Sequence, residues 1–357
     1  MLTAMPPIAA VWSPRTREHV PDAEIWVGTR IPGTEVAERV DVLLDSLAAE
    51  GHDLVEAEPH GDERLAGVHD RALLNHLATV HARWTASGIV EESGQDRVVP
   101  YLFPTAAMLG GIPRTDATAV HGQAGAYCYD TMTLVGPGTW PAARAAADCA
   151  LSAADLVTGG ARAAYALSRP PGHHVTASAY GGSCYLNNAA VAAEALRRAG
   201  HERVAVIDVD AHHGNGTSAI FYERADVFYG SVHVDPAAGW FPHFVGHASE
   251  TGAGPGLGAN RNVPLAPGTG DQDFLTGVDL LVETAAERGS TALVVSLGVD
   301  AAADDPESPL RVTGDGYRRA GGLLAGLDLP TVLVQEGGYH LPSLGRLVAD
   351  FLSPFGS

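Results

Sequence analysis

The stretch that decides the fold is residues 203–216, which read RVAVIDVDAHHGNG. Its first part, 203–207, is a short apolar run, and two aspartates and two histidines follow it closely. An apolar run without polar alternation is typical of a strand buried on both faces of a parallel sheet. Parallel α/β sheets bind their ligands beyond the carboxyl ends of the strands. The stretch therefore predicts a sheet strand with a functional site at its end.

Apolar runs and helical patterns alternate along the chain around this stretch. We expect further strands at 163–167, 227–234, 292–297 and 331–334, and helices at 34–50, 70–80, 140–158, 187–198, 271–288 and 315–326. Strands that alternate with helices indicate βαβ units, and hence an α/β fold with a mostly parallel central sheet and helices on both faces. Because no repeat or low-complexity linker interrupts the pattern, we expect a single domain over residues 1–357.

The N-terminal part of the chain reads differently. Residues 87–138 contain many Gly and Pro residues and show weak periodicity. A long irregular segment within a compact domain is usually functional. We therefore expect residues 1–138 to be a loop-rich part and residues 139–357 to hold the sheet core with the catalytic motifs.

The charge of the chain excludes several kinds of chemistry. It has 42 Asp and Glu residues against 22 Lys and Arg, a net charge of −20, and all the basic residues are arginines. Without lysine there is no Schiff-base nucleophile and no lysine for a phosphate-binding loop. An acidic chain also lacks the basic surface that general nucleic-acid binding needs. We expect a small, neutral or cationic partner instead of nucleic acid.

The cysteine content and the hydropathy indicate the compartment. The three cysteines, Cys128, Cys149 and Cys184, are few, odd in number and without metal-binding spacing, which favours a reducing environment. The N-terminus lacks the pattern of a signal peptide, and no apolar stretch is long enough to span a membrane. We expect a cytoplasmic protein without a membrane partner.

Polar clusters follow the other predicted strands as well. RPPGHH ends at His174 after one strand, GVD ends at Asp300 after another, and QEGGY ends at Tyr339 after the last strand. Since the carboxyl ends of parallel strands share one edge of a sheet, these clusters should meet the DVDAHH segment in space. The alternative is that these polar residues only cap the strands and bind loop backbone, in which case the clusters need not lie close together.

Asp208, Asp210 and His212 have the spacing of a cation site. On an extended segment, residues two apart face the same side, so Asp210 and His212 can bind one cation while Asp208 supports them from behind. Asp300 arrives from another strand as a third ligand. Two carboxylates and one imidazole leave a position open for water, which suits a catalytic Zn²⁺, Fe²⁺ or Co²⁺ ion.

Two further groups are candidates for acid–base chemistry. His173 and His174 are adjacent, so one can act on the substrate while the other orients or tunes it. Tyr339, on a Gly-Gly turn, can donate a hydrogen bond to a developing oxyanion. The alternatives are a satisfied pair of loop histidines and a buried structural tyrosine.

The motifs together resemble the histone deacetylase superfamily. They are, in chain order, RPPGHH (169–174), YGGSCYLNNAAVAA (180–193), DVDAHHGNG (208–216), NVPLAPGTGD (262–271), SLGVDAAADDP (296–306) and EGGY (336–339). Within the superfamily the chain is similar to the bacterial acetylpolyamine amidohydrolases and class II-like deacetylases. The resemblance implies the arginase/deacetylase-like fold.

The resemblance implies a role for each site residue. Asp210, His212 and Asp300 would bind Zn²⁺, His174 would act as general base and then acid, and Tyr339 would polarise the amide carbonyl. His173, paired with Asp208, would supply electrostatic support, and Asn215 would orient His174. A structural K⁺ ion is expected near Asp208 and Ser231. Relatives in the acetylpolyamine branch are often dimers whose N-terminal insertion narrows the channel entrance, so a homodimer is also expected, with residues 1–138 as the part that forms the channel and the dimer contact.

The substrate side of the site carries a departure from the family pattern. Phe241 and Gly182 would line the acyl channel, but Ser183 stands where relatives usually place an aromatic wall. We therefore expect a wider or more polar channel on that side. Glu24 and Asp130 are candidates for attracting an ammonium tail at the channel rim, or else are solvated surface carboxylates.

The expected activity is zinc-dependent hydrolysis of an acylated amine such as an N-acetylpolyamine. Acetyl-lysine peptides and amides with bulkier acyl groups stay open as substrates, and so does a binding protein for acyl amines without turnover. An arginase-type ureohydrolase is disfavoured, because its second metal needs carboxylates where His213, Asn215 and Gly298 stand.

Overall fold

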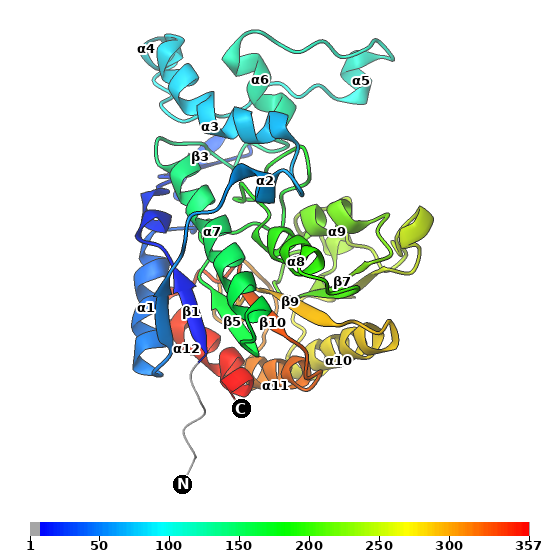
Figure 1. The fold of residues 1–357 in the computed structure, drawn as a ribbon. Helices are drawn as coiled ribbons and strands as arrows, with labels where there is room; N and C mark the ends of the chain where they lie inside the picture. The colour runs from blue at the N-terminus through cyan, green and yellow to red at the C-terminus, as the bar shows by residue number, and fades with distance from the viewer. Residues whose placement is uncertain (1–7, 357) are drawn as a thin grey trace.

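The computed structural model describes residues 8–356, and its centre is a parallel eight-stranded sheet (Figure 1). The strand order is β4-β1-β5-β10-β9-β6-β7-β8, with every neighbouring pair parallel. The strands are β1 (Ala9–Trp12), β4 (Asp53–Glu56), β5 (Ala163–Ala166), β6 (Val204–Asp208), β7 (Val227–Val234), β8 (Asn260–Leu265), β9 (Ala292–Leu297) and β10 (Thr331–Gln335). The α/β fold and all five predicted strands are confirmed.

Helices cover both faces of the sheet because each inner strand is apolar on both sides. On β6, Val204 and Val206 belong to one buried cluster, and Ala205 and Ile207 belong to the cluster on the opposite face. Side chains of α7 (Thr139–Thr158) and α8 (Asn188–Arg198) complete the first cluster. The second is completed by α1 (Glu38–Ala49), α10 (Asp271–Glu287), α11 (Gly314–Ala325) and α12 (Leu341–Leu352). The predicted helices on both faces are therefore confirmed.

Two strands of the sheet come from the first part of the chain. Strand β1 lies between β4 and β5 in the sheet, and Ala10 and Val11 are fully buried there. This corrects the expectation that residues 139–357 hold the whole sheet core. Strand β1 is as short as β5, but it lacks the polar motif that follows β5 in the sequence, so its short apolar run did not stand out. The edge strand β8 was also not predicted, because two asparagines and an arginine interrupt its apolar residues.

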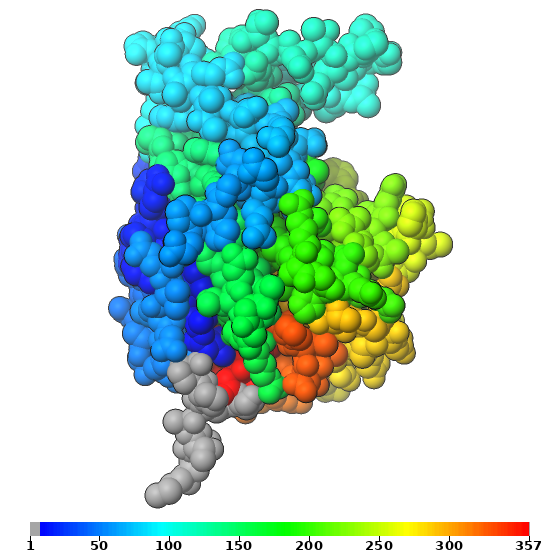
Figure 2. All heavy atoms as spheres, viewed as in Figure 1, coloured from blue at the N-terminus to red at the C-terminus, as the bar shows by residue number. Residues whose placement is uncertain are grey.

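The segment expected to be irregular contains short helices. These are α4 (Ile89–Ser93), α5 (Ala106–Leu109) and α6 (Val120–Tyr127), preceded by α2 (Asp62–Leu65) and the long α3 (Arg71–Ala86). Figures 1 and 2 show residues 71–127, drawn in cyan to green, as a lobe that projects beyond the body of the sheet. On this lobe Tyr101, Met108 and Ile112 are more than half exposed.

A hairpin of β2 (Glu24–Trp26) and β3 (Thr29–Ile31) precedes α1. Helix α1 begins at Glu38 and not at residue 34 as predicted. Glu35, three residues before the helix starts, points its side chain into the interior and is only 2% exposed. Within residues 8–356, no helix combines the length and the apolar character that crossing a membrane requires.

Candidate metal centre and active site

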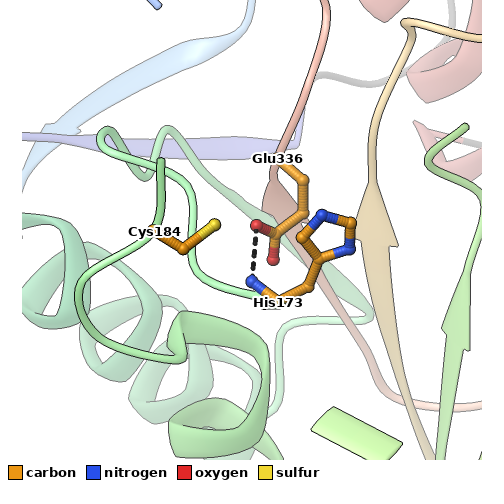
Figure 3. A group of neighbouring side chains, drawn as sticks. All are labelled: His173, Cys184 and Glu336. Atoms are coloured by element: carbon orange, nitrogen blue, oxygen red, sulfur yellow. Dashed lines mark hydrogen bonds between the residues drawn. The ribbon is translucent and has the colours of Figure 1, made fainter. Parts of the chain in front are cut away.

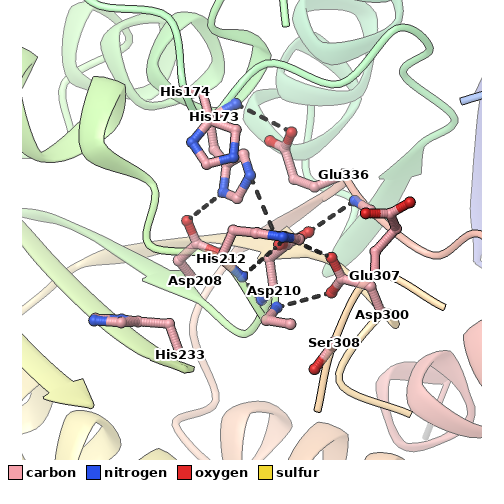
Figure 4. A network of polar contacts seen from close by, with 12 residues as sticks. His173, His174, Asp208, Asp210, His212, His233, Asp300, Glu307, Ser308 and Glu336 are labelled. Carbon is pink, nitrogen blue, oxygen red and sulfur yellow. Dashed lines mark hydrogen bonds and ion pairs between the residues drawn. The ribbon is translucent and has the colours of Figure 1, made fainter. Parts of the chain in front are cut away.

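Asp210, His212 and Asp300 meet at the carboxyl ends of the adjacent strands β6 and β9 (Figure 4). The Nδ1 atom of His212 lies 3.2 Å from Oδ1 of Asp210 and 3.0 Å from Oδ2 of Asp300. Both carboxylates are fully buried, and their ligand atoms lie within 4.8 Å of one another and of the imidazole. The structure therefore brings together the three residues predicted as metal ligands.

The chemistry of this cluster fits a divalent cation. Among the described residues, no guanidinium pairs with Asp210 or Asp300, and histidines are their only ion-pair partners. Burial and the charge of Asp210 raise the pKa of Asp300 to about 7. A cation bound between the two carboxylates would relieve their mutual repulsion. Two carboxylates and one imidazole form a donor set suited to Zn²⁺ or Fe²⁺, so the residues fit such an ion.

Two glycines make room for the carboxylates. A Cβ atom on Gly298 would lie 2.0 Å from Oδ2 of Asp210, and one on Gly337 would lie 2.5 Å from Oδ2 of both Asp210 and Asp300. The Gly337 amide also donates a hydrogen bond of 2.8 Å to Asp210. Since Gly298 cannot carry a side chain here, it cannot supply the second-metal ligand of a ureohydrolase.

His173 is held as a cation beside the cluster. Its Nδ1 atom lies 3.0 Å from Oδ2 of Asp208, which also accepts a hydrogen bond of 3.2 Å from the Tyr229 hydroxyl. Burial opposes protonation, but the carboxylates of Asp210 and Asp208 outweigh it and raise the pKa of His173 to about 10. The Asp210 and Asp208 carboxylates therefore favour the imidazolium form of His173.

His174 is held as a neutral imidazole. Its Nδ1 atom lies 2.7 Å from Oδ1 of Asn215, and its ring meets the Phe241 ring edge-on at 4.9 Å. Burial, followed by the positive charges of His173 and His212, places the pKa of His174 well below its usual value. The hydrogen bond to Asn215 acts in the opposite direction. With a proton on Nδ1, the Nε2 atom keeps a free lone pair.

Tyr339 reaches the same cavity from the end of β10. Its backbone amide donates a hydrogen bond of 2.7 Å to Asp305, and the guanidinium of Arg39 lies 4.9 Å from the centre of its ring. Burial raises the pKa of Tyr339 well above its usual value, although Arg39 acts against this. The phenol therefore stays protonated and can donate a hydrogen bond.

These side chains line a cavity of about 400 Å³. His174, His212 and Tyr339 are among the polar residues of its wall. The predicted channel residues Phe241, Gly182, Ser183 and Glu24 also line it, together with Trp26, Trp240 and Glu307. Burial and then the charge of Glu307 raise the pKa of Glu24 to about 7. The cavity thus combines aromatic faces with the carboxyl groups of Glu24 and Glu307, and Glu35 also lines it.

Asp130 does not reach the rim, contrary to one of its two predicted roles. It is absent from the cavity wall, and its carboxylate accepts hydrogen bonds from the backbone of Gly182 at 2.6 Å and of Thr133 and Met132 at 2.9 Å. These bonds fix the turn that carries Ser183. Glu307 was missed by the sequence reasoning, although it follows Asp300 by seven residues on the same loop.

Two further clusters lie close to the centre. Asp208 and Ser231 are direct neighbours on β6 and β7, where a structural cation was predicted, and the Ser231 hydroxyl lies 2.8 Å from Nδ1 of His233. His173, Cys184 and Glu336 form a second group (Figure 3). Burial raises the pKa of the Cys184 thiol well above its usual value, so the thiolate that a metal ligand requires is disfavoured there.

Comparisons with known proteins find similar sequences and a similar fold. The sequence profile of the histone deacetylase domain family matches residues 33–354. The chain is 41% identical over 330 residues to acetylpolyamine amidohydrolase from Mycoplana ramosa, covering 92% of this chain and 94% of that protein. It is 40% identical over 349 residues to acetylpolyamine amidohydrolase 1 from Pseudomonas aeruginosa, covering 97% of this chain and 98% of that protein. The crystal structure of acetylpolyamine aminohydrolase from Burkholderia pseudomallei superposes with a TM-score of 0.91 at 41% identity, covering 98% and 99% of the two chains.

Proposed function

The chain belongs to the histone deacetylase family, and we propose that it is a metal-dependent amidohydrolase that removes the acetyl group from N-acetylated polyamines. The observation that carries the proposal is the placement of Asp210, His212 and Asp300 beside His174 and Tyr339 at one cavity. A metal triad, a neutral imidazole and a protonated phenol together can supply the Lewis acid, the general base and the oxyanion donor of metal-assisted amide hydrolysis.

The reaction follows from the state of each side chain. Zn²⁺ held by Asp210, His212 and Asp300 would supply a Lewis acid that polarises the amide carbonyl and lowers the pKa of a water molecule. His174 takes a proton from the attacking water on Nε2 and then delivers it to the nitrogen of the leaving amine. The Tyr339 hydroxyl donates a hydrogen bond to the carbonyl oxygen as that oxygen gains negative charge. The His173 imidazolium stabilises the same charge.

The cavity wall supports a cationic amine as the leaving group. Glu24 and Glu307 are the carboxyl groups among the lining residues that do not belong to the metal centre or to a buried ion pair. Ionised, they would attract the ammonium groups of a polyamine, and the net charge of −20 adds a long-range attraction. The aromatic faces of Trp26 and Trp240 suit both methylene groups and cations.

The remaining assignments are part of the same proposal. We propose Zn²⁺ as the native metal, with Fe²⁺ or Co²⁺ as alternatives, and K⁺ near Asp208 and Ser231. One catalytic domain is supported because the sheet takes strands from both ends of the chain. The exposed apolar residues of the 71–127 lobe support a homodimer, and the three buried, unpaired cysteines support a reducing, cytoplasmic location.

The experiment that tests the function is a hydrolysis panel with the zinc-loaded protein. N-acetylputrescine, N-acetylcadaverine, N8-acetylspermidine, an acetyl-lysine peptide and amides with larger acyl groups are compared by kcat/KM. We expect the acetylated diamines to be the best substrates and Asp300→Ala to abolish turnover. A strong preference for the peptide, or for the larger acyl groups that Ser183 leaves room for, would overturn the substrate assignment. Tight binding of all compounds without turnover would show a binding protein instead.

A further inference from the structure

A buried carboxylate outside the metal centre joins two arginines. Oε1 of Glu35 lies 2.7 Å from Nε of Arg169 and 2.9 Å from Nη1 of Arg39, and Oε2 lies 2.9 Å from Nη2 of Arg169. All three side chains are 1–2% exposed, and the two arginines are the largest fully buried side chains among the described residues. Removing such charges from water costs folding free energy unless each charge is paired and hydrogen-bonded. The other hydrogen bonds of the two arginines therefore indicate what the cluster does.

Arg39 connects the cluster to the turn that carries Tyr339. Its Nε donates a hydrogen bond of 2.8 Å to the Gly338 carbonyl, and its Nη2 donates one of 2.5 Å to the Glu336 carbonyl. The same guanidinium stacks over the Tyr339 ring at 4.9 Å. Every donor of Arg39 with an assigned partner thus goes either to Glu35 or to the residues just before Tyr339.

Arg169 connects the cluster to the segment that carries the catalytic histidines. It lies four and five residues before His173 and His174 in the RPPGHH motif. Its remaining donors go to the carbonyls of Thr16 at 2.7 Å and His19 at 2.9 Å, in and next to the short helix η1 (Pro14–Glu18). Arg169 is therefore fixed at both ends, and Glu35 is fixed to it through two hydrogen bonds.

The charge state of the cluster makes Glu35 its only anion. Burial opposes ionisation of Glu35, but Arg169 and Arg39 outweigh it and lower the pKa of the carboxyl. His19 lies 3.7 Å from Glu35, yet burial lowers the pKa of this histidine to about 3, so it is neutral. No other carboxylate among the described residues forms an ion pair with Arg39 or Arg169.

We propose that Glu35 is a positioning residue: it fixes Arg39 against Arg169 and thereby sets where Tyr339 stands relative to His174. This inference rests on the proposed deacetylase function. Glu35 lines the cavity, but the two guanidinium groups saturate its carboxylate, so it acts on the chemical step and not on substrate affinity. Misplacing a catalytic group by about 1 Å can lower a rate by about 100-fold, so a small displacement of the Tyr339 turn is enough to be measured.

The test is a double-mutant cycle in kcat for zinc-loaded protein with N-acetylputrescine. Glu35→Gln is made alone and together with Tyr339→Phe. In the wild-type background we expect kcat to fall by about 10- to 100-fold with KM changed less than about twofold. In the Tyr339→Phe background, where the hydroxyl to be positioned is gone, the same substitution should lower kcat by less than about threefold.

Two comparisons separate positioning from general destabilisation. Glu194→Gln removes a carboxylate that pairs with Arg198 and Arg224 away from the cavity, and it should leave kcat unchanged. Zinc content is measured for every variant, so that a loss of metal is recognised. If Glu35→Gln does not fold, Glu35→Asp enters the same cycle; it keeps the charge but withdraws the carboxylate, and kcat should fall by about 10-fold.

If Glu35→Gln lowers kcat by the same factor in the wild-type and Tyr339→Phe backgrounds, or raises KM without changing kcat, Glu35 does not act through Tyr339. Failure of the wild type to hydrolyse any acetylated amine would instead refute the proposed function. The two failures are therefore distinct.

Discussion

The Nδ1 atom of His174 lies 2.7 Å from Oδ1 of Asn215, so a neutral amide and not a carboxylate orients the proposed general base. Because an amide oxygen accepts the Nδ1 proton without adding a negative charge, it orients the ring while doing little to stabilise the imidazolium. The low pKa of His174, caused mainly by burial, keeps Nε2 available as a base down to acidic pH.

Asn215→Asp should therefore move the acid limb of the pH–rate profile. A carboxylate at this position stabilises the protonated imidazole and raises the pKa of His174. The acid limb of kcat/KM should shift upward by about one pH unit or more. Asn215→Ala is the matched control, since it removes the orienting bond without adding charge and should lower the rate without an upward shift. An unmoved acid limb in Asn215→Asp would mean that His174 is not the titrating base.

Gly298→Ala should empty the metal centre. The added Cβ would lie 2.0 Å from Oδ2 of Asp210, so this ligand could not keep its position. We expect loss of bound zinc by elemental analysis and loss of activity, because ligand geometry controls affinity. Gly322→Ala, at a helical position with nothing within 4 Å of the new Cβ, is the control and should keep its full zinc content. Full zinc occupancy in Gly298→Ala would contradict the assigned ligand geometry.

Glu24→Gln and Glu307→Gln should weaken the binding of charged substrates. Each removes a carboxylate from the cavity wall, so KM for N-acetylputrescine should rise by about 5- to 50-fold with a smaller change in kcat. An uncharged analogue such as N-butylacetamide serves as the control substrate, and its kcat/KM should be nearly unchanged. Equal losses for both substrates would show that the two residues do not recognise the ammonium group.

Stability should fall in acid because His69 is buried as a neutral ring. Its Nδ1 lies 3.1 Å from the Thr176 carbonyl and its Nε2 accepts a bond of 2.9 Å from the Asn187 amide, while burial lowers its pKa to about 4. In the unfolded chain His69 binds a proton near pH 6.5, whereas in the folded chain it binds one only near pH 4. The free energy of unfolding should therefore drop by roughly 3 kcal/mol from this residue between pH 7 and pH 4.

Urea unfolding at several pH values measures this dependence. His69→Gln should be less stable at pH 7 but should show a shallower fall toward pH 4. His121→Gln, at an exposed position, is the control and should keep the wild-type dependence. An unchanged slope in His69→Gln would assign the acid sensitivity to other groups.

The parts of the fold that were predictable are those with a strong local pattern. The apolar runs that became β5, β6, β9 and β10 each end in a polar motif, and the topology of a parallel sheet brings these ends together without further information. For this reason Asp210, His212 and Asp300 could be predicted to lie together as ligands of one cation. Strand β1 could not be recognised, because its four residues carry little pattern and no polar motif follows them; its pairing with β4 and β5 and the burial of Ala10 and Val11 stabilise it in the fold.

The parts that were not predictable depend on burial and on contacts distant in sequence. Glu24 and Asp130 look alike as acidic loop residues, yet one lines the cavity and the other binds the backbone beneath it. Glu35 and Arg169 are 134 residues apart, and no local pattern connects them. The only sequence feature that points to Glu307 is its position seven residues after Asp300. That position alone does not show that the loop returns to the cavity, which only the structure shows.

The central claim is that the residues at this cavity hydrolyse an acetylated amine, and acetate release from N-acetylputrescine tests it most directly. Wild type and Tyr339→Phe are compared at equal, measured zinc content. We expect turnover by the wild type and a loss of about 100- to 1,000-fold in kcat for Tyr339→Phe, because one oxyanion donor is removed. No acetate release by the zinc-loaded wild type, or an unchanged kcat in Tyr339→Phe, would contradict the claim.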